Sequence, residues 1–195
     1  MKRALTIAIV AGVIAAGGGV AVLAQRMAAP ARASVSVAQP AAAEIKRPAF
    51  TEIKWPFLMD QWGLGRAFRC DAAVCGAKVE VYVRPKIGFC NCTTGVADDE
   101  ELERVGDMEL IGEQFKASSD GHPIAVAWMK GRSRPYDVAG RASGSTLALA
   151  FNDHCDVIVA TAVVTDGPAA RVEPAVLAFL NSDTVVNWAK QALGL

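Results

Sequence analysis

Five cysteines carry most of the reactive chemistry that this 195-residue sequence offers. They are Cys70, Cys75, Cys90, Cys92 and Cys155. In an oxidising compartment cysteines usually pair, so five of them allow two disulfides and leave one thiol. Cys70 and Cys75 enclose a turn-sized loop and can bridge each other, whereas Cys90 and Cys92 lie too nearly parallel on one strand face to do so. We therefore expect a Cys70–Cys75 bridge and a second bridge from Cys155 to either Cys90 or Cys92.

A metal site is the alternative use of the same sulfurs. Cys90, Cys92, His154 and Cys155 together supply four soft ligands that suit zinc or cuprous copper. The spacings differ from the two-residue knuckles of common zinc sites, and no methionine–histidine cluster lies nearby. A thiol redox site is favoured less, because no Cys-x-x-Cys opens a helix. The sequence thus predicts no cofactor, with copper or zinc as the alternative.

An enzyme active site is not evident. Only His122 and His154 could serve as a general base, and His154, beside Asp153 and Asp156, is the better candidate for a hydrolase. No Gly-x-Ser-x-Gly elbow is present. We therefore expect a non-catalytic protein.

Arginines gather in the turn-rich segment 130–141, where Arg132 and Arg134 offer planar forks that suit a carboxylate or another anion. A solvated loop is the ordinary interpretation of such a segment. Across the whole chain, Lys plus Arg and Asp plus Glu number 20 each, so no excess of positive charge favours nucleic acid. We expect no nucleic-acid partner.

The N-terminal segment predicts export. Residues 4–24 are uncharged, follow Lys2 and Arg3, and are long enough to cross a bilayer as a helix. The positive-inside rule then places the N-terminus in the cytoplasm and the remainder in the periplasm, as a single-pass protein of the inner membrane. Small residues around positions 22–24 and 31–33 also allow signal cleavage, which would release a soluble periplasmic protein.

Two further segments complete the predicted domain organisation. Residues 25–49 are rich in Ala, Pro and Ser and predict a flexible linker. Residues 50–195 are then a single periplasmic globular domain. Its first part, 55–70, brings two tryptophans and two phenylalanines, which we expect to fold over the core as an arm; an exposed aromatic patch for a partner is the alternative.

The clearest strand pattern is the strict alternation over residues 78–84. It predicts a half-buried strand with its valines inward and with Lys78, Glu80, Tyr82 and Arg84 toward solvent. Pro85 and Lys86 suit a turn, after which residues 87–92 would return as the second strand of a hairpin with both cysteines inward.

The remaining patterns predict an α+β fold. An acidic cluster opens a short helix at 98–105, and alternating or apolar runs indicate further strands before two terminal helices. These further strands are 124–130, 146–151 and 156–164, and the helices are 172–180 and 183–193. We expect an antiparallel sheet of about five strands, with two hairpins and with the two C-terminal helices on one face. Such a domain fits an envelope binding or accessory module that contacts another envelope or membrane protein.

Overall fold

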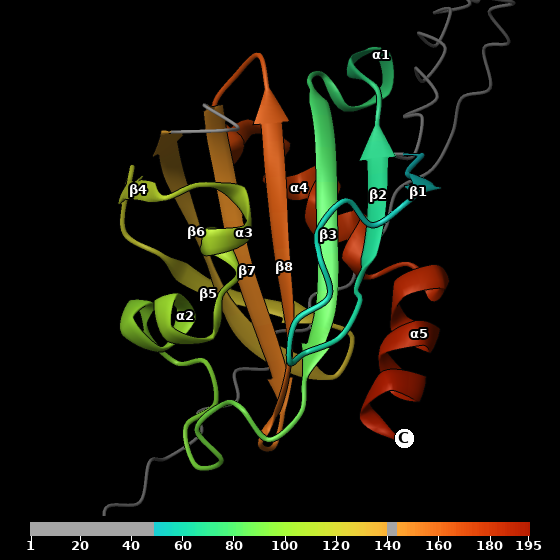
Figure 1. The fold of residues 1–195 in the computed structure, drawn as a ribbon, viewed down its shortest axis with the longest axis vertical. Helices are drawn as coiled ribbons and strands as arrows, with labels where there is room; N and C mark the ends of the chain where they lie inside the picture. Colours follow the sequence, from blue (N-terminus) through green and yellow to red (C-terminus); the bar gives the residue numbers. More distant parts are fainter. Residues whose placement is uncertain (1–48, 140–143) are drawn as a thin grey trace, which may run out of the picture. The chain divides into compact units, whose positions relative to one another are not determined.

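An antiparallel sheet of eight strands organises the computed structural model, which describes residues 49–139 and 144–195 (Figure 1). The strands follow the order β1-β2-β3-β8-β7-β6-β4, and β5 also pairs with β6. Their bounds are β1 (Thr51–Ile53), β2 (Arg66–Cys70), β3 (Lys78–Lys86), β4 (Gln114–Ala117), β5 (His122–Val126), β6 (Met129–Ala139), β7 (Gly144–Asp153) and β8 (Asp156–Thr165).

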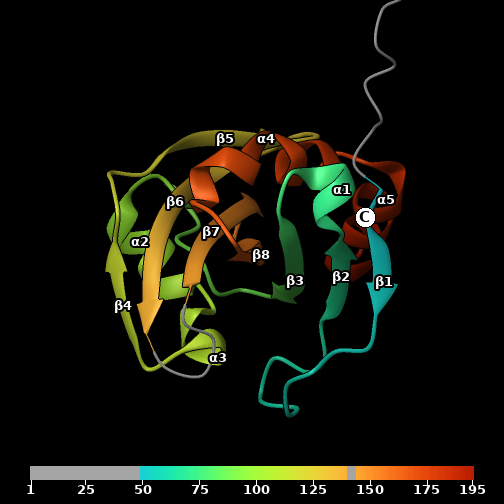
Figure 2. The same cartoon turned by 90° about the horizontal axis from the view of Figure 1, so that it is seen from above.

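Helices cover both faces of this sheet (Figure 2). They are α1 (Ala72–Cys75), α2 (Asp99–Val105), α3 (Met108–Ile111), α4 (Ala169–Leu180) and α5 (Asp183–Leu193). Helices α4 and α5 bury apolar residues against the face that carries Val79, Val81 and Val83. Helices α2 and α3 pack on the opposite face. The protein therefore has one apolar core on each side of the sheet.

The centre of the sheet is the β7–β8 hairpin, which closes at the Asp153–Asp156 pair. Both strands are rich in valine, alanine and leucine and are buried on both faces along most of their length. Residues with small or branched side chains suit strands that are covered on both sides. The expected strands at 146–151 and 156–164 and their hairpin are confirmed.

Helix starts and stops also follow local signals. Helix α2 occupies the segment 98–105 that the acidic cluster predicted to be a short helix, and the Asp98 carboxylate caps it by accepting a hydrogen bond from the Glu101 amide at 2.8 Å. Helices α4 and α5 occupy the two terminal segments expected to be helical, and α5 ends at Gly194 in the left-handed conformation.

The predicted five-strand sheet is wrong in its size and in its covering. Strand β3 does not turn at Pro85 but continues to Lys86, and it pairs with β8 and β2 instead of with residues 87–92, which form a loop. Proline is tolerated there because β2 pairs with β3 only as far as Val83, so Pro85 has a neighbouring strand on one side only. The expected strand at 124–130 is divided by a turn into the end of β5 and the start of β6.

Among the residues that the structure describes, no helix is long and apolar enough to span a membrane. The predicted anchor or signal segment, 1–24, lies outside them. So does the predicted linker, 25–49, except for its last residue.

Candidate functional site

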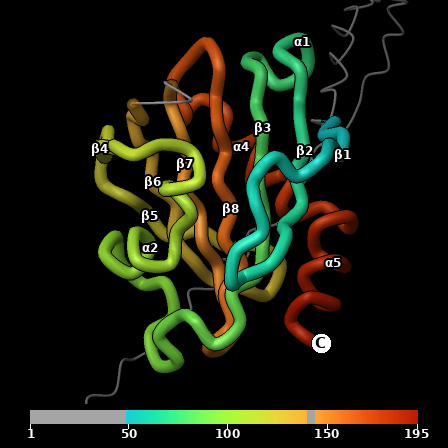
Figure 3. Tube along the Cα trace, in the orientation of Figure 1, coloured from blue at the N-terminus to red at the C-terminus, as the bar shows by residue number. Residues whose placement is uncertain are grey.

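The segment between β1 and β2, residues 54–65, forms an arm that crosses the sheet on the same face as α2 and α3 (Figure 3). Trp55 and Phe57 point inward and contact the Tyr82 ring edge-on, with centroid distances of 6.1 and 4.8 Å. These aromatic contacts fix the first half of the arm to β3. The expectation that this segment folds over the core therefore agrees with the packing of Trp55 and Phe57.

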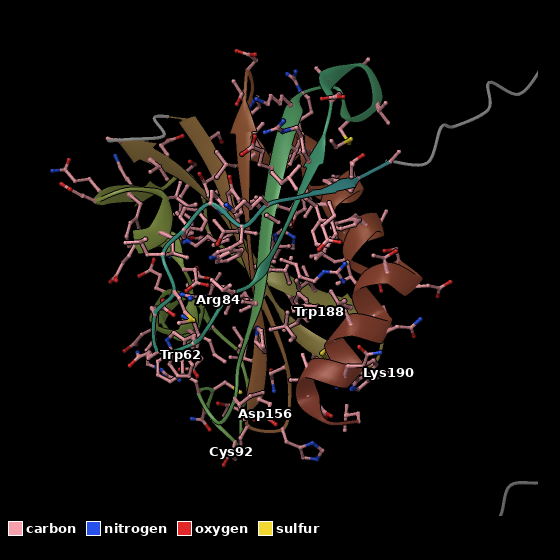
Figure 4. All side chains as sticks on the ribbon, turned by 45° about the vertical axis from the view of Figure 1, so that its right-hand side comes forward. Trp62, Arg84, Cys92, Asp156, Trp188 and Lys190 are labelled. Atoms are coloured by element: carbon pink, nitrogen blue, oxygen red, sulfur yellow. A yellow bond between two sulfur atoms is a disulfide. The ribbon has the colours of Figure 1, made fainter. Side chains whose placement is uncertain are left out.

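The second half of the arm is held by an ion pair and an aromatic contact. The Asp60 carboxylate accepts hydrogen bonds from the Arg84 Nη1 group through both of its oxygens, at 2.8 and 2.7 Å. The Trp62 ring lies 4.5 Å from the Phe89 ring, centroid to centroid. Trp62 and Arg84 are seen on the same side of the molecule in Figure 4. The arm is thus ordered along its length by contacts from beneath.

Arg84 is the centre of a buried network of charges. Its side chain is 3% exposed, and its Nε and Nη2 groups donate to the two Asp107 oxygens at 2.6 Å each. Lys86, 4% exposed, donates to the backbone oxygens of Val105 and Gly106 at 2.6 and 3.1 Å and lies 2.8 Å from Asp107. Two cations therefore face two carboxylates, Asp60 and Asp107, so that the charges balance.

A cleft of about 270 Å³ opens above this network. Its walls come from the arm, the end of β3, α2, α3 and β4. The Lys86 Nζ lies 5.6 Å from the centroid of the Trp62 ring and 5.4 Å from that of Phe89, so the aromatic side chains border the charged floor. We take the arm and this cleft together as the candidate functional site.

The outer side of the arm exposes large apolar side chains. Leu58 is 92% exposed, Met59 73% and Leu64 61%. Ile87, in the loop after β3, is also exposed. Because the inner side of the arm is already packed, these side chains have no apolar neighbour surface left to cover them. They form the exposed apolar part of the site.

Sequence reasoning missed this site because it placed Tyr82 and Arg84 in solvent. Both are buried, since the arm and α3 cover the polar side of β3. Tyr82 donates a 2.6 Å hydrogen bond to Glu80, and burial followed by this bond raises the pKa of Tyr82. The available signal was the number of aromatic residues in the arm, because such side chains must pack on a surface, and here that surface is the polar side of β3.

Asp60 gives the arm a pH dependence. The hydrogen bonds from Arg84 lower the pKa of Asp60, so the folded state is favoured while Asp60 is ionised. This contribution is present above the ordinary aspartate value of about 3.9 and is lost as the pH falls through the lowered pKa. We expect the Trp62 indole NMR signal to move toward a solvent-exposed position during this acidification.

The matched variant for that titration is Asp60→Asn. At neutral pH its Trp62 signal should already be shifted in the direction of the acid form, and it should lack the acid transition. Other carboxylates titrate in both proteins, so only the difference between the two curves reports on Asp60. Identical curves would show that Asp60 does not hold the arm.

The cysteines occupy two places in the fold. Cys70 is bonded to Cys75, and Cys92 to Cys155, whereas Cys90 is a buried thiol. Disulfide bonds, which the sequence predicted, are therefore present, and they indicate an oxidising environment.

The Cys90 amide donates to the Cys155 oxygen at 3.1 Å, and its thiol lies 3.2 Å from the His154 oxygen. Burial raises the pKa of the Cys90 thiol, and the nearby carboxylates of Glu101 and Asp156 raise it further.

The loop that carries these sulfurs is fixed at several points. The Asn91 side chain accepts hydrogen bonds from the amides of Thr93 and Thr94 at 2.9 and 3.2 Å, and the Gly88 amide donates to Asp156 at 2.6 Å. Cys92 and Asp156 lie at the same end of the sheet in Figure 4. The loop is therefore a structured element that the second disulfide joins to the β7–β8 hairpin.

The residues of the metal alternative are Cys90, Cys92, His154 and Cys155. In the structure Cys92 and Cys155 are used in a disulfide, a form in which neither sulfur is a thiolate ligand. Within residues 49–139 and 144–195, no group of three or more His, Cys, Asp or Glu is arranged to hold a metal. The His154 side chain is 89% exposed and pairs with Asp153 at 2.9 Å.

The two arginines considered for anion binding contact helix α2. Arg132 pairs with Asp99 and donates to the Gly121 oxygen at 2.9 Å. Arg134 donates to Glu103 at 2.8 Å and to the Ser119 oxygen at 2.9 Å. Their forks hold α2 against β6, so an external anion would have to displace carboxylates that belong to the protein itself.

No protein-family model matches this chain, and neither a curated protein nor a solved structure matches it at a significant level.

Proposed function

We propose that this protein is an exported, non-catalytic binding module that presents its arm to another protein of the cell envelope. The observation that carries this proposal is the two-sided nature of the arm. Its inner side is held by Trp55, Phe57 and Asp60, while Leu58 and Met59 on its outer side are exposed.

The energetics of such an arm favour binding. Fully burying a leucine or methionine side chain contributes about 1.5–3 kcal/mol, so burial of Leu58, Met59 and Leu64 is a substantial driving force. Because the arm is already ordered by contacts from beneath, less conformational entropy is lost on association. Leu58 and Met59 are neighbours in the chain, and large apolar side chains gathered on a protein surface typically mark an interaction site.

The proposed location is the periplasm. Two disulfides fit an oxidising compartment, and residues 4–24 supply the export signal. The module is either tethered to the inner membrane by that segment or released by cleavage. In both cases the partner is an envelope or membrane protein within reach of the arm.

Site-specific photocrosslinking tests this proposal. A photoreactive residue at position 58 is expected to yield a defined adduct whose partner mass spectrometry identifies. The same residue at Asn187, exposed on α5 and on the opposite face, is the matched control and should yield no such adduct. The purified partner should bind the native protein at least tenfold more tightly than it binds the double variant Leu58→Ser/Met59→Ser. Equal adducts from both positions, or equal binding of the variant, would refute the proposal.

A further inference from the structure

We infer that the cleft beside the arm receives a basic side chain, arginine or lysine, from the partner. This inference rests on the proposed function, since it names the chemistry that the same site recognises. The cleft adjoins the arm directly, because Asp60 and Trp62 line its wall. A partner that covers Leu58 and Met59 would therefore lie next to the cleft mouth.

The cations in the cleft are already used by the protein. The Arg84 Nε and Nη2 groups donate to Asp107, and its Nη1 group donates to Asp60. The Lys86 Nζ donates to two backbone oxygens and contacts Asp107. Both side chains are nearly fully buried. Arg104 pairs with Glu101 and donates to the Phe89 oxygen at 2.7 Å. An anionic ligand would therefore meet no free donor on Arg84 or Lys86, and on Arg104 only the Nη1 group, whose charge Glu101 already balances.

The carboxylates that line the cleft and are not fully paired leave it with negative charge. Glu109 lines the cleft, is exposed, and forms no ion pair with any other residue that the structure describes. Glu103 also lines the cleft, and its Oε1 accepts from Arg134 and Tyr136. Its Oε2 accepts no hydrogen bond from the described part of the chain. A cation from outside is the complementary occupant.

Aromatic side chains complete the site. Phe115 lines the cleft and is 40% exposed, so part of its ring remains open to a ligand. An ammonium or guanidinium group over an aromatic face is stabilised by the ring quadrupole, and the apolar stem of lysine or arginine can pack on Leu110. Small-molecule sites usually measure about 300–1,000 Å³, so a cleft of about 270 Å³ suits one side chain better than a free cofactor.

The probe for this inference is the peptide acetyl-Leu-Arg-Leu-amide, with the citrulline analogue as an uncharged control of the same shape. Titration into the full chain should shift the Trp62 indole NMR signal to saturation, and the citrulline peptide should bind at least fivefold more weakly. Glu109→Lys should weaken arginine-peptide binding at least tenfold. Glu113→Lys, an equal charge change at an exposed residue outside the cleft, should change it less than twofold.

Three results would overturn the inference: no saturable shift, equal binding of the two peptides, or native-like binding by Glu109→Lys. These results are distinct from a failure of the proposed function. If crosslinking at position 58 still depends on the arm while the peptide does not bind, the cleft inference fails and the binding module stands. If Leu58→Ser/Met59→Ser binds the identified partner normally, both fail.

Discussion

Replacing Asp107 with asparagine is expected to lower the free energy of unfolding by about 3–5 kcal/mol, the usual cost of removing one partner from a buried ion pair. The substitution preserves the shape of the side chain but removes the charge that Arg84 and Lys86 share. Both cations are nearly fully buried and meet water only through the cleft, so water replaces the lost carboxylate only in part. Urea unfolding, followed by far-UV circular dichroism, measures the change.

The matched control is Asp60→Asn, which removes the other carboxylate on Arg84. The Asp60 side chain is 39% exposed, so its loss should cost less than about 1 kcal/mol. Replacing the three buried members of the network with apolar residues, Arg84→Met/Lys86→Met/Asp107→Leu, is expected to recover most of the stability. If Asp107→Asn and Asp60→Asn destabilise the protein equally, burial of the network is not what makes it important.

Local patterns account for the parts of the fold that were predicted correctly. The β7–β8 hairpin joins segments that are adjacent in the chain, and its apolar runs are interrupted only at the turn around His154. Helix α5 begins directly after Ser182, a residue type favoured before a helix, and ends at Gly194 in the left-handed conformation. Elements of this kind depend on interactions between residues that are close in the chain, at most from Ser145 to Val164 in the hairpin, and a sequence displays such patterns directly.

The errors come from contacts between distant segments. Alternation over residues 78–84 shows that one face of β3 is apolar, but it does not reveal whether another layer covers the polar face. The pairing of β3 with β8 joins residues about 80 positions apart, such as Val81 and Ala162, so no local signal specifies it. Without that pairing, residues 87–92 were the nearest available partner strand, which led to the wrong hairpin.

The candidate site divides in the same way. The chemistry of the cysteines could be inferred from their number and from export, because oxidation depends on the compartment more than on the fold. The cleft could not be inferred from the sequence, because Arg84 and Lys86 contact Asp107 only when α3 packs on β3. The arginine cluster shows the opposite case. Arg132 and Arg134 do bind carboxylates, as their guanidinium groups suggest. These carboxylates belong to helix α2 of the same protein and not to an external ligand.

Removing the Cys92–Cys155 bridge is expected to destabilise the protein more than removing Cys70–Cys75. A disulfide limits the entropy of the unfolded chain in proportion to the logarithm of the loop that it closes. The two bridges span sequence separations of 63 and 5 residues. The loss predicted for Cys92→Ser/Cys155→Ser is about 4 kcal/mol, against about 2 kcal/mol for Cys70→Ser/Cys75→Ser. Urea unfolding of both variants without reductant compares the two losses.

The single variant Cys92→Ser tests why Cys90 is present beside this bridge. The Cys90 amide donates to the Cys155 oxygen at 3.1 Å, and the Cys90 thiol lies 3.2 Å from the His154 oxygen, so Cys90 is close in the fold to the cysteine that Cys92→Ser would leave unpaired. Oxidation should then join Cys90 to Cys155, a loop of nearly the same length, and should restore part of the stability lost in the double variant. Peptide mapping without reductant identifies the bridge. A free Cys155, or a dimer joined through it, would show that the buried Cys90 thiol cannot replace Cys92.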